Sequence, residues 1–321
     1  MSAFTMAAPH PLSAAALFGL KDWVAVVTGG GTGVGLMIAQ TLAANGAKVY
    51  ITGRRAHVLE ASARIHGAKD KLGEHAGEIL PIVMDVTDKE SIKSAVAKIE
   101  EKEGYLNVFG LYLRRVSQCA DMLAWLLDSL VNNAGVWKSR PTAKPTDGPE
   151  TFGAAMFAEE IEDNWQQSFL TNATSHYFVT AAFLPLLAKA ISSPVEQVGT
   201  VINNASASKA AAVHVTRQMA YDLSHENINV RVNGLALVRA AGTGYFPSEM
   251  TTGASNDENQ SSYDIEQFRA FMQLTGVKTV KRMGSPREIA SVILTLATNE
   301  YIWGTVTILD GGFTLNLPGN M

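Results

Sequence analysis

Short apolar runs recur along the chain and predict strands that are buried inside a sheet. Between most of them, apolar residues recur at helical spacing instead. The apolar runs are Trp23–Val27, Ala47–Thr52, Glu78–Met84, Val198–Asn203, Asn229–Gly234 and Thr305–Leu309. Strands that alternate with helices pair in parallel, because each connection must cross back over the sheet. The pattern therefore predicts an α/β fold with a doubly wound parallel sheet and helices on both faces.

The helical segments have recognisable ends. Asn45-Gly46 stops the first helix, and Asp88 is a plausible cap for the third. Ser285 and Glu288 form a capping box, with Pro286 at the first helical position. The predicted helices are Gly33–Asn45, Arg55–His66, Asp88–Glu103, a segment from about Ala207, and Ser285–Thr298. Two polar stretches, Lys138–Gly153 and Thr251–Ser262, are expected to be loops.

Composition narrows the function classes. The 321 residues are 47% hydrophobic, which is enough for a large core, and 26 basic against 30 acidic residues give a net charge of -4. This balance argues against binding of nucleic acid through its phosphates. The single cysteine, Cys119, excludes an internal disulfide and a cysteine-rich zinc site. No segment resembles a membrane span or a signal peptide, so we expect a cytoplasmic protein, with residues 1–20 as an extension of one domain covering 21–321.

A glycine-rich turn joins the first strand to the first helix. Glycines at such a junction let the backbone turn tightly and approach a pyrophosphate at the helix N-terminus. A tight turn without a ligand would use the same glycines, but the strand-turn-helix context favours a nucleotide site. The candidate cofactor-binding residues here are Thr28, Gly29, Gly31, Thr32, Gly33, Val34 and Gly35.

The end of the second strand indicates which nucleotide is bound. In nicotinamide-binding folds this position faces the adenosine ribose, where an acid binds a free 2′-hydroxyl and an arginine accepts a 2′-phosphate. Here the strand ends in Thr52-Gly53-Arg54-Arg55, without an acid. Arg54 therefore favours NADP over NAD, although a solvated arginine pair at a helix start would look the same.

With these residues in view, the chain resembles the short-chain dehydrogenase/reductase family over residues 16–317. The Thr28–Gly35 turn matches the cofactor motif of that family, and Asp85-Val86 matches the pair that contacts adenine. Asn132-Asn133-Ala134-Gly135 matches the motif of the fourth strand, and Asp310-Gly311-Gly312 follows the last strand. Tyr245–Met250 and the C-terminal residues are similar to 3-oxoacyl-[acyl-carrier-protein] reductase-like members, including the rhamnolipid-type reductase branch.

The resemblance implies a Rossmann-like sheet of about seven strands and hydride transfer between NADPH and a ketone or 3-oxoacyl thioester. In the family, a tyrosine protonates the carbonyl oxygen, a lysine four residues later lowers its pKa and holds the ribose, a serine orients the carbonyl, and an asparagine supports a water relay. It also implies a homo-oligomer, a dimer or tetramer. The catalytic positions fall on Asn172, Ser206 and Lys209, and the cofactor positions beyond the turn on Arg54, Asp85, Val86, Asn133, Ala134, Gly135, Lys209, Phe246 and Ser248.

The catalytic segment departs from the family pattern. Read from the left, Gly199–Ser206 matches the strand leading to the serine, which makes Ser206 that residue. Read from the right, Ala205–Lys209 matches Tyr-x-x-x-Lys, which places Ala205 at the tyrosine position. The family has about a dozen residues between serine and tyrosine, and here the two matches overlap. The proton donor is therefore missing.

Other tyrosines are weak substitutes. Tyr221 is twelve residues beyond Lys209, which places it about 120° around the helix and about 18 Å along it. Tyr177 and Tyr245 remain candidates in principle, although packing or surface roles explain them as well.

Two further segments depart from the family. Phe109–Ser129 is inserted before the fourth strand, which Leu127–Asn132 restores, and it predicts a helical extension. Leu237–Gly244 replaces an expected Pro-Gly in the loop near the nicotinamide. We therefore hypothesise altered exon boundaries in the gene model, or a pseudoenzyme. Three functions stay open: a working NADPH-dependent reductase, a catalytically impaired nucleotide-binding relative, and an interaction protein that uses the inserted helix.

Overall fold

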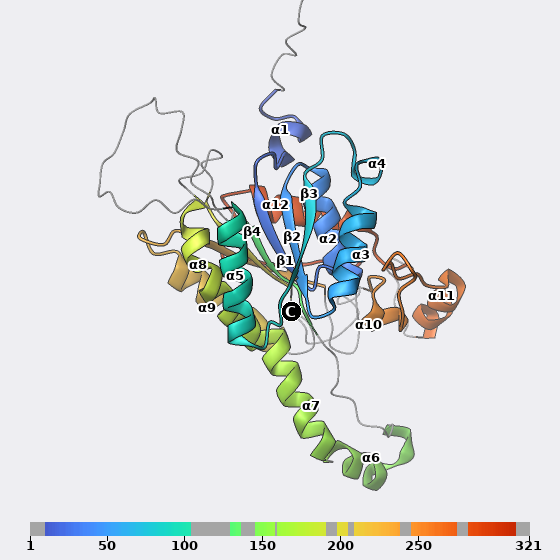
Figure 1. Ribbon diagram of the computed structural model, residues 1–321. Coiled ribbons are helices and arrows are strands. Elements are labelled where there is room, and N and C mark those ends of the chain that lie inside the picture. The colour runs from blue at the N-terminus through green and yellow to red at the C-terminus, as the bar shows by residue number, and fades with distance from the viewer. Residues whose placement is uncertain are drawn as a thin grey trace, which may run out of the picture.

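Figure 1 shows a central sheet with helices packed around it in the computed structural model of the chain. The model describes residues 10–103, 129–135, 145–157, 159–190, 198–204, 209–237, 245–274 and 282–312. In these ranges no helix is both long and apolar enough to cross a membrane.

The sheet has seven strands in the order β3-β2-β1-β4-β5-β6-β7, and every pairing is parallel. The strands are β1 Val24–Thr28, β2 Lys48–Gly53, β3 Glu78–Val83, β4 Ser129–Asn132, β5 Thr200–Asn204, β6 Arg231–Ala236 and β7 Val306–Ile308. The chain winds outward from β1 in one direction and then from β4 in the other, so the topology switches between β1 and β4. This is the Rossmann-like, doubly wound fold expected from the sequence, with strand ends shifted by one or two residues.

The helices cover both faces of the sheet. They are α1 Ala14–Phe18, α2 Gly33–Ala44, α3 Ala56–His66, α4 Lys69–Leu72, α5 Lys89–Glu103, α6 Pro149–Met156, α7 Glu159–Phe169, α8 Ser175–Ala188, α9 Lys209–Leu223, α10 Glu249–Thr252, α11 Ile265–Leu274 and α12 Pro286–Thr298. A 3-10 turn spans Pro145–Asp147, and a π-helical turn, η2, spans Leu170–Thr174 between α7 and α8. The capping box of Ser285 and Glu288 at α12 is confirmed.

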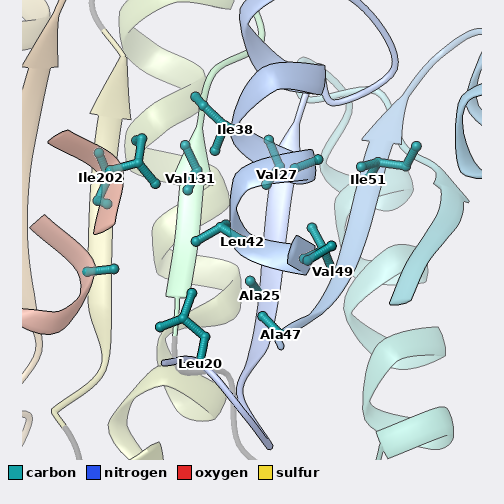
Figure 2. Packing of buried hydrophobic residues seen from close by; sticks show 14 of the residues in the cluster. Leu20, Ala25, Val27, Ile38, Leu42, Ala47, Val49, Ile51, Val131 and Ile202 are labelled. Carbon is teal, nitrogen blue, oxygen red and sulfur yellow. The ribbon is translucent and has the colours of Figure 1, made fainter. Parts of the chain in front are cut away.

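Alternate strand residues build two separate cores, as the pleat of a sheet covered on both faces requires. Ala25 and Val27 of β1 pack against α2 and α12, whereas Val24 and Val26 pack against α5, α8 and α9. In Figure 2, Ile38 and Leu42 of α2 lie over the labelled residues of β1, β2, β4 and β5. The strand ends that carry the candidate site are therefore anchored from both sides.

Both expected loops are wrong in part: Thr251 and Thr252, at the start of the second stretch, are the last residues of α10. The Lys138–Gly153 stretch was expected to be loop, but α6 begins inside it at Pro149. Gly148 with a positive φ precedes the helix, Pro149 occupies its first turn and Glu150 adds an acidic residue there. These are ordinary helix-start signals, and they outweigh the polar composition of the stretch. In Figure 1, α7 projects away from the sheet, with α6 at its far end.

The shortened connection between β5 and α9 leaves the sheet intact. β5 pairs with β4 over Ser129–Asn132 and with β6 over Arg231–Leu235. It ends at Asn204, and α9 begins at Lys209. The strand holds its place because its hydrogen bonds run to its neighbours and not to the connection that follows it.

Candidate active site

The glycine-rich turn lies at the carboxyl end of β1, where α2 begins. Gly29 and Gly33 both have positive φ values, 64° and 52°, which favour glycine. A Cβ atom on Gly35 would lie 2.1 Å from the carbonyl oxygen of Gly29, so the turn and the helix meet without room for a side chain. Thr32 is the N-cap of α2, but its side chain makes no capping hydrogen bond. The first amides of α2 are thus not capped by this hydroxyl, which suits an anion at this helix end.

The fourth-strand motif is bonded to this turn. The Thr28 hydroxyl accepts hydrogen bonds from the backbone amides of Asn133 and Ala134, at 2.9 and 3.0 Å. The Asn133 side-chain amide donates to the carbonyl oxygens of Thr28 and Gly29, at 3.1 and 3.3 Å. Residues about a hundred positions apart in sequence are therefore fixed together at the topological switch point, the usual place of a ligand in this class of sheet. Gly135 follows directly and is exposed.

The two arginines after β2 have different surroundings. Arg55 forms an ion pair with Glu249 of α10, with its Nη2 2.9 Å and its Nη1 3.4 Å from the carboxylate oxygens. Arg54 is exposed, and in the described part of the chain it forms no ion pair. Its guanidinium is thus available to an anionic ligand at the end of β2.

The pair expected to contact adenine lies at the end of β3. The carboxylate of Asp85 accepts hydrogen bonds from the backbone amide and the hydroxyl of Thr87, at 2.9 and 2.7 Å. Its backbone amide donates to the Ser91 hydroxyl at 2.9 Å, and Val86 is buried. These contacts order the turn that follows β3.

The segment after β6 approaches the glycine-rich turn. A Cβ atom on Gly33 would come within 2.8 Å of the Ser248 Cβ atom, so these two backbones are in close contact. Phe246 is buried, and its ring fills the space beside Gly284, where a Cβ atom would meet it at 2.2 Å. Ser248 therefore lies at the candidate nucleotide site, whereas the side chain of Phe246 belongs to the core.

The candidate catalytic residues are only partly described. Asn172 is 1% exposed and lies in the π-helical turn η2, a local distortion that is frequent at functional sites. Lys209 is the first residue of α9, and Ala205 and Ser206 lie outside the described residues, in the connection that precedes it. The predicted helical segment at Phe109–Ser129 and the 238–244 part of the nicotinamide loop also lie outside them, apart from Ser129 in β4.

The three tyrosines considered as substitutes for the missing proton donor are either exposed or packed against another ring. Tyr221 and Tyr177 are 81% and 52% exposed, on α9 and α8. The ring of Tyr245 packs edge-on against Phe268, with centroids 5.3 Å apart.

A buried polar network beneath the site was not predicted. The Asn132 side-chain amide donates to the Asn203 side-chain oxygen at 2.9 Å and to the Thr180 hydroxyl at 3.0 Å. Asn203 in turn donates to the Thr216 hydroxyl at 3.0 Å. The network joins α8, β4, β5 and α9. The only signal in the sequence was an asparagine at or near the carboxyl end of each of two strands, Asn132 of β4 and Asn203 of β5.

His176, on α8 next to this network, was also missed. It is 2% exposed, and neither ring nitrogen has a hydrogen-bond partner in the described structure. Burial lowers the pKa of His176 from 6.5 to about 4, because the cation would lose its hydration there. The side chain is therefore neutral at physiological pH.

Comparison with known proteins supports this geometry. Residues 23–110 match the family model described as short chain dehydrogenase, and residues 116–314 match the one described as Enoyl-(Acyl carrier protein) reductase. The chain is 33% identical to short-chain dehydrogenase/reductase PhomF of Diaporthe leptostromiformis, over 94% of each chain. It is 29% identical to the rhamnolipids biosynthesis 3-oxoacyl-[acyl-carrier-protein] reductase of Pseudomonas aeruginosa, over 93% of this chain and 98% of the relative.

Among solved structures, the chain is similar to the RhlG/NADP active-site complex of Pseudomonas aeruginosa. The TM-score is 0.64 with 27% sequence identity, over 92% of this chain and 98% of the other. The alignment with PhomF runs over 326 positions, more than the 321 residues of this chain, so that relative carries residues that this chain lacks.

Proposed function

The chain belongs to the short-chain dehydrogenase/reductase family of oxidoreductases, and on that premise we propose that it binds NADP(H) but reduces carbonyl substrates poorly. The observation that carries the proposal is the length of the β5–α9 connection. β5 ends at Asn204 and α9 begins at Lys209, with Ala205 at the tyrosine position. Four residues cannot supply a serine and a tyrosine that are a dozen positions apart.

The described residues fit a dinucleotide phosphate. Glycines at the β1–α2 junction and the start of α2 would receive the pyrophosphate, and Arg54 would pair with the 2′-phosphate of the ribose. Asp85 and Val86 would border the adenine. Asn133, Ala134 and Gly135 would border the nicotinamide half, with Ser248 facing Gly33. The NADP complex of the similar bacterial protein supports this assignment.

The chain can perform part of the chemistry. The cofactor, when bound, supplies a hydride. Lys209 would hold the ribose, and Asn172 would order water beside it. Ser206 would donate a hydrogen bond to the substrate carbonyl, but its hydroxyl is far too weak an acid to replace a tyrosine assisted by a lysine. The negative charge that develops on the carbonyl oxygen would therefore not be neutralised by a proton.

We propose a ketone or a 3-oxoacyl thioester as the substrate class, because 3-oxoacyl reductases are among the similar proteins. A dimer or tetramer and a cytoplasmic location are proposed on the same basis of family resemblance. Residues 1–20 and 21–321 are proposed as an extension and one domain.

Two experiments test this function. Fluorescence titration with NADPH should show binding, and its absence would favour an interaction protein instead. A variant in which about a dozen loop residues are restored, with a serine and a tyrosine at separate positions, should gain NADPH-dependent ketone reduction. The point variant Ala205→Tyr is the matched control and should stay slow, because it does not separate serine from tyrosine.

The origin of the departures has its own test. The match to the first family model ends at residue 110, and the match to the second begins at residue 116. Both of these ends lie inside the predicted insertion. We propose altered exon boundaries as the cause. Sequencing of the transcript across codons 108–130, 203–210 and 236–244 should reveal different junctions, and a transcript that encodes this chain unchanged would overturn the proposal.

A further inference from the structure

The polar segment 248–260, which follows β6, lies along α3 and the glycine-rich turn; we call it the clasp. The Asn259 side-chain amide donates to the Ser62 hydroxyl at 2.8 Å, and Ser62 donates to the Gly31 carbonyl oxygen at 2.7 Å. At the far end of α3, a ring nitrogen of His66 lies 2.6 Å from the Glu258 carbonyl oxygen. The clasp is therefore bonded both to α3 and, through Ser62, to the turn that would hold the pyrophosphate.

The near end of the clasp carries a carboxylate to the ribose side of the site. Ser248 contacts Gly33. The next residue, Glu249, accepts hydrogen bonds from the Arg55 guanidinium through both carboxylate oxygens. In Figure 1, α10 lies beside α3 accordingly. Glu249 thus contacts the residue next to Arg54, the arginine proposed to receive a 2′-phosphate.

This ion pair is weak enough to be exchanged. The two side chains are 53% and 36% exposed, and exposed pairs contribute at most about 1 kcal/mol. A phosphate monoester carries a charge between -1 and -2 at neutral pH and binds guanidinium groups more strongly than one carboxylate does. A 2′-phosphate beside Arg54 would meet both an attractive Arg55 and a repulsive Glu249.

We propose that Glu249 sets the cofactor preference of this chain by competing with the 2′-phosphate for Arg55. The inference rests on the proposed NADP(H) binding and adds a residue that acts against it. Glu249 lowers the affinity for NADPH and leaves the affinity for NADH unchanged, because NADH has no phosphate at this position.

The test measures dissociation constants of the full chain for NADPH and NADH by fluorescence, and for 2′,5′-ADP and 5′-AMP by calorimetry. Glu249→Gln should tighten NADPH and 2′,5′-ADP about threefold to tenfold at low salt, the scale of an exposed ion pair plus a nearby like charge. NADH and 5′-AMP should be unaffected. Asp257→Asn is the matched control, because it removes the same charge from an exposed position in the clasp, and it should leave all four constants unchanged.

Two further measurements separate competition from a general charge effect. In an Arg55→Ala background, Glu249→Gln should change NADPH affinity by much less, because the residue for which both anions compete is gone. The gain in NADPH affinity from Glu249→Gln should also become smaller as the salt concentration is raised from about 0.05 to about 0.5 M, because salt screens the interaction between exposed charges.

The outcomes distinguish the two proposals. If the unmodified chain and Glu249→Gln bind both cofactors with the same NADPH-to-NADH ratio, the competition is overturned and NADP(H) binding stands. If Glu249→Gln weakens NADPH, Glu249 positions Arg55 for the phosphate, and the competition is again overturned. If neither chain binds any of the four nucleotides, both proposals fall.

Discussion

At the residue scale, neighbouring side chains of the same type have different tasks. Arg54 and Arg55 are adjacent in sequence, yet Arg55 is paired with Glu249 and Arg54 is exposed at the strand end. The position of Arg54 at the end of the second strand, with no acidic residue beside it, predicted a site for the 2′-phosphate of NADP. The partner of Arg55, 194 positions away, could not be predicted, because no local pattern reports which distant loop returns to a strand end.

Removal of the Arg54 guanidinium should separate the two cofactors. We expect Arg54→Ala to weaken NADPH binding by about 1.5–3 kcal/mol, the value of a hydrogen bond to a charged group, and to leave NADH nearly unchanged. Fluorescence titration with both cofactors measures the difference. An equal loss for both would mean that Arg54 supports the fold of the site and not the 2′-phosphate.

His176 should make stability depend on pH. Burial lowers the pKa of His176 to about 4. Between pH 6.5 and pH 4, the unfolded chain therefore binds a proton at this histidine and the folded chain does not. The free energy of unfolding should therefore fall as the pH is lowered from 6.5 to 4, by about 3 kcal/mol in total. Urea unfolding at a series of pH values measures this.

A pair of variants isolates the contribution of this histidine. His176→Leu should remove most of the pH dependence between 6.5 and 4, whereas His214→Gln, at an exposed position on α9, should retain it. If both variants kept the slope of the unmodified chain, carboxylates and not His176 would be responsible.

At the scale of elements, the junction between β1 and α2 shows what the sequence could specify. The glycines of this turn were predicted because a turn, a helix start and a close approach all require them. The π-helical turn at Asn172 was not predicted, because such turns are rare single-turn distortions that no particular residue type specifies. The start signals at Pro149 were present in the sequence, but the composition of the surrounding stretch led to the prediction of a loop.

Two glycine-to-alanine variants should behave in opposite ways. A Cβ atom on Gly35 would lie 2.1 Å from the Gly29 oxygen and 2.5 Å from the Asn133 amide nitrogen. Gly35→Ala should therefore cost about 1–3 kcal/mol of stability, as overpacking does, and abolish NADPH binding. Gly153, in α6, has open space around it, and Gly153→Ala should be neutral or stabilising by up to about 1 kcal/mol.

Thermal unfolding and NADPH titration of both variants test this expectation. A Gly35→Ala chain that kept native stability and affinity would show that the turn can open without loss, and the account of its close packing would be wrong.

At the scale of the whole molecule, the sheet and the catalytic segment are separable. The strand order was expected from alternating apolar runs, and the sheet is complete although β5 is followed by only four residues before α9. The hydrogen bonds of β5 run sideways to β4 and β6. The proposed loss of the proton donor is therefore compatible with an intact sheet, because the two depend on different residues.

The steady-state rate of NADPH oxidation by the unmodified chain, with a panel of ketones and 3-oxoacyl thioesters, tests the central claim most directly. General acid catalysis is typically worth 10²–10⁴-fold, or about 3–5 kcal/mol. We therefore predict saturable NADPH binding with turnover at least about a hundredfold below that of the variant with the restored loop. Turnover of the unmodified chain in the ordinary enzyme range of about 1–10³ s⁻¹ would contradict the account.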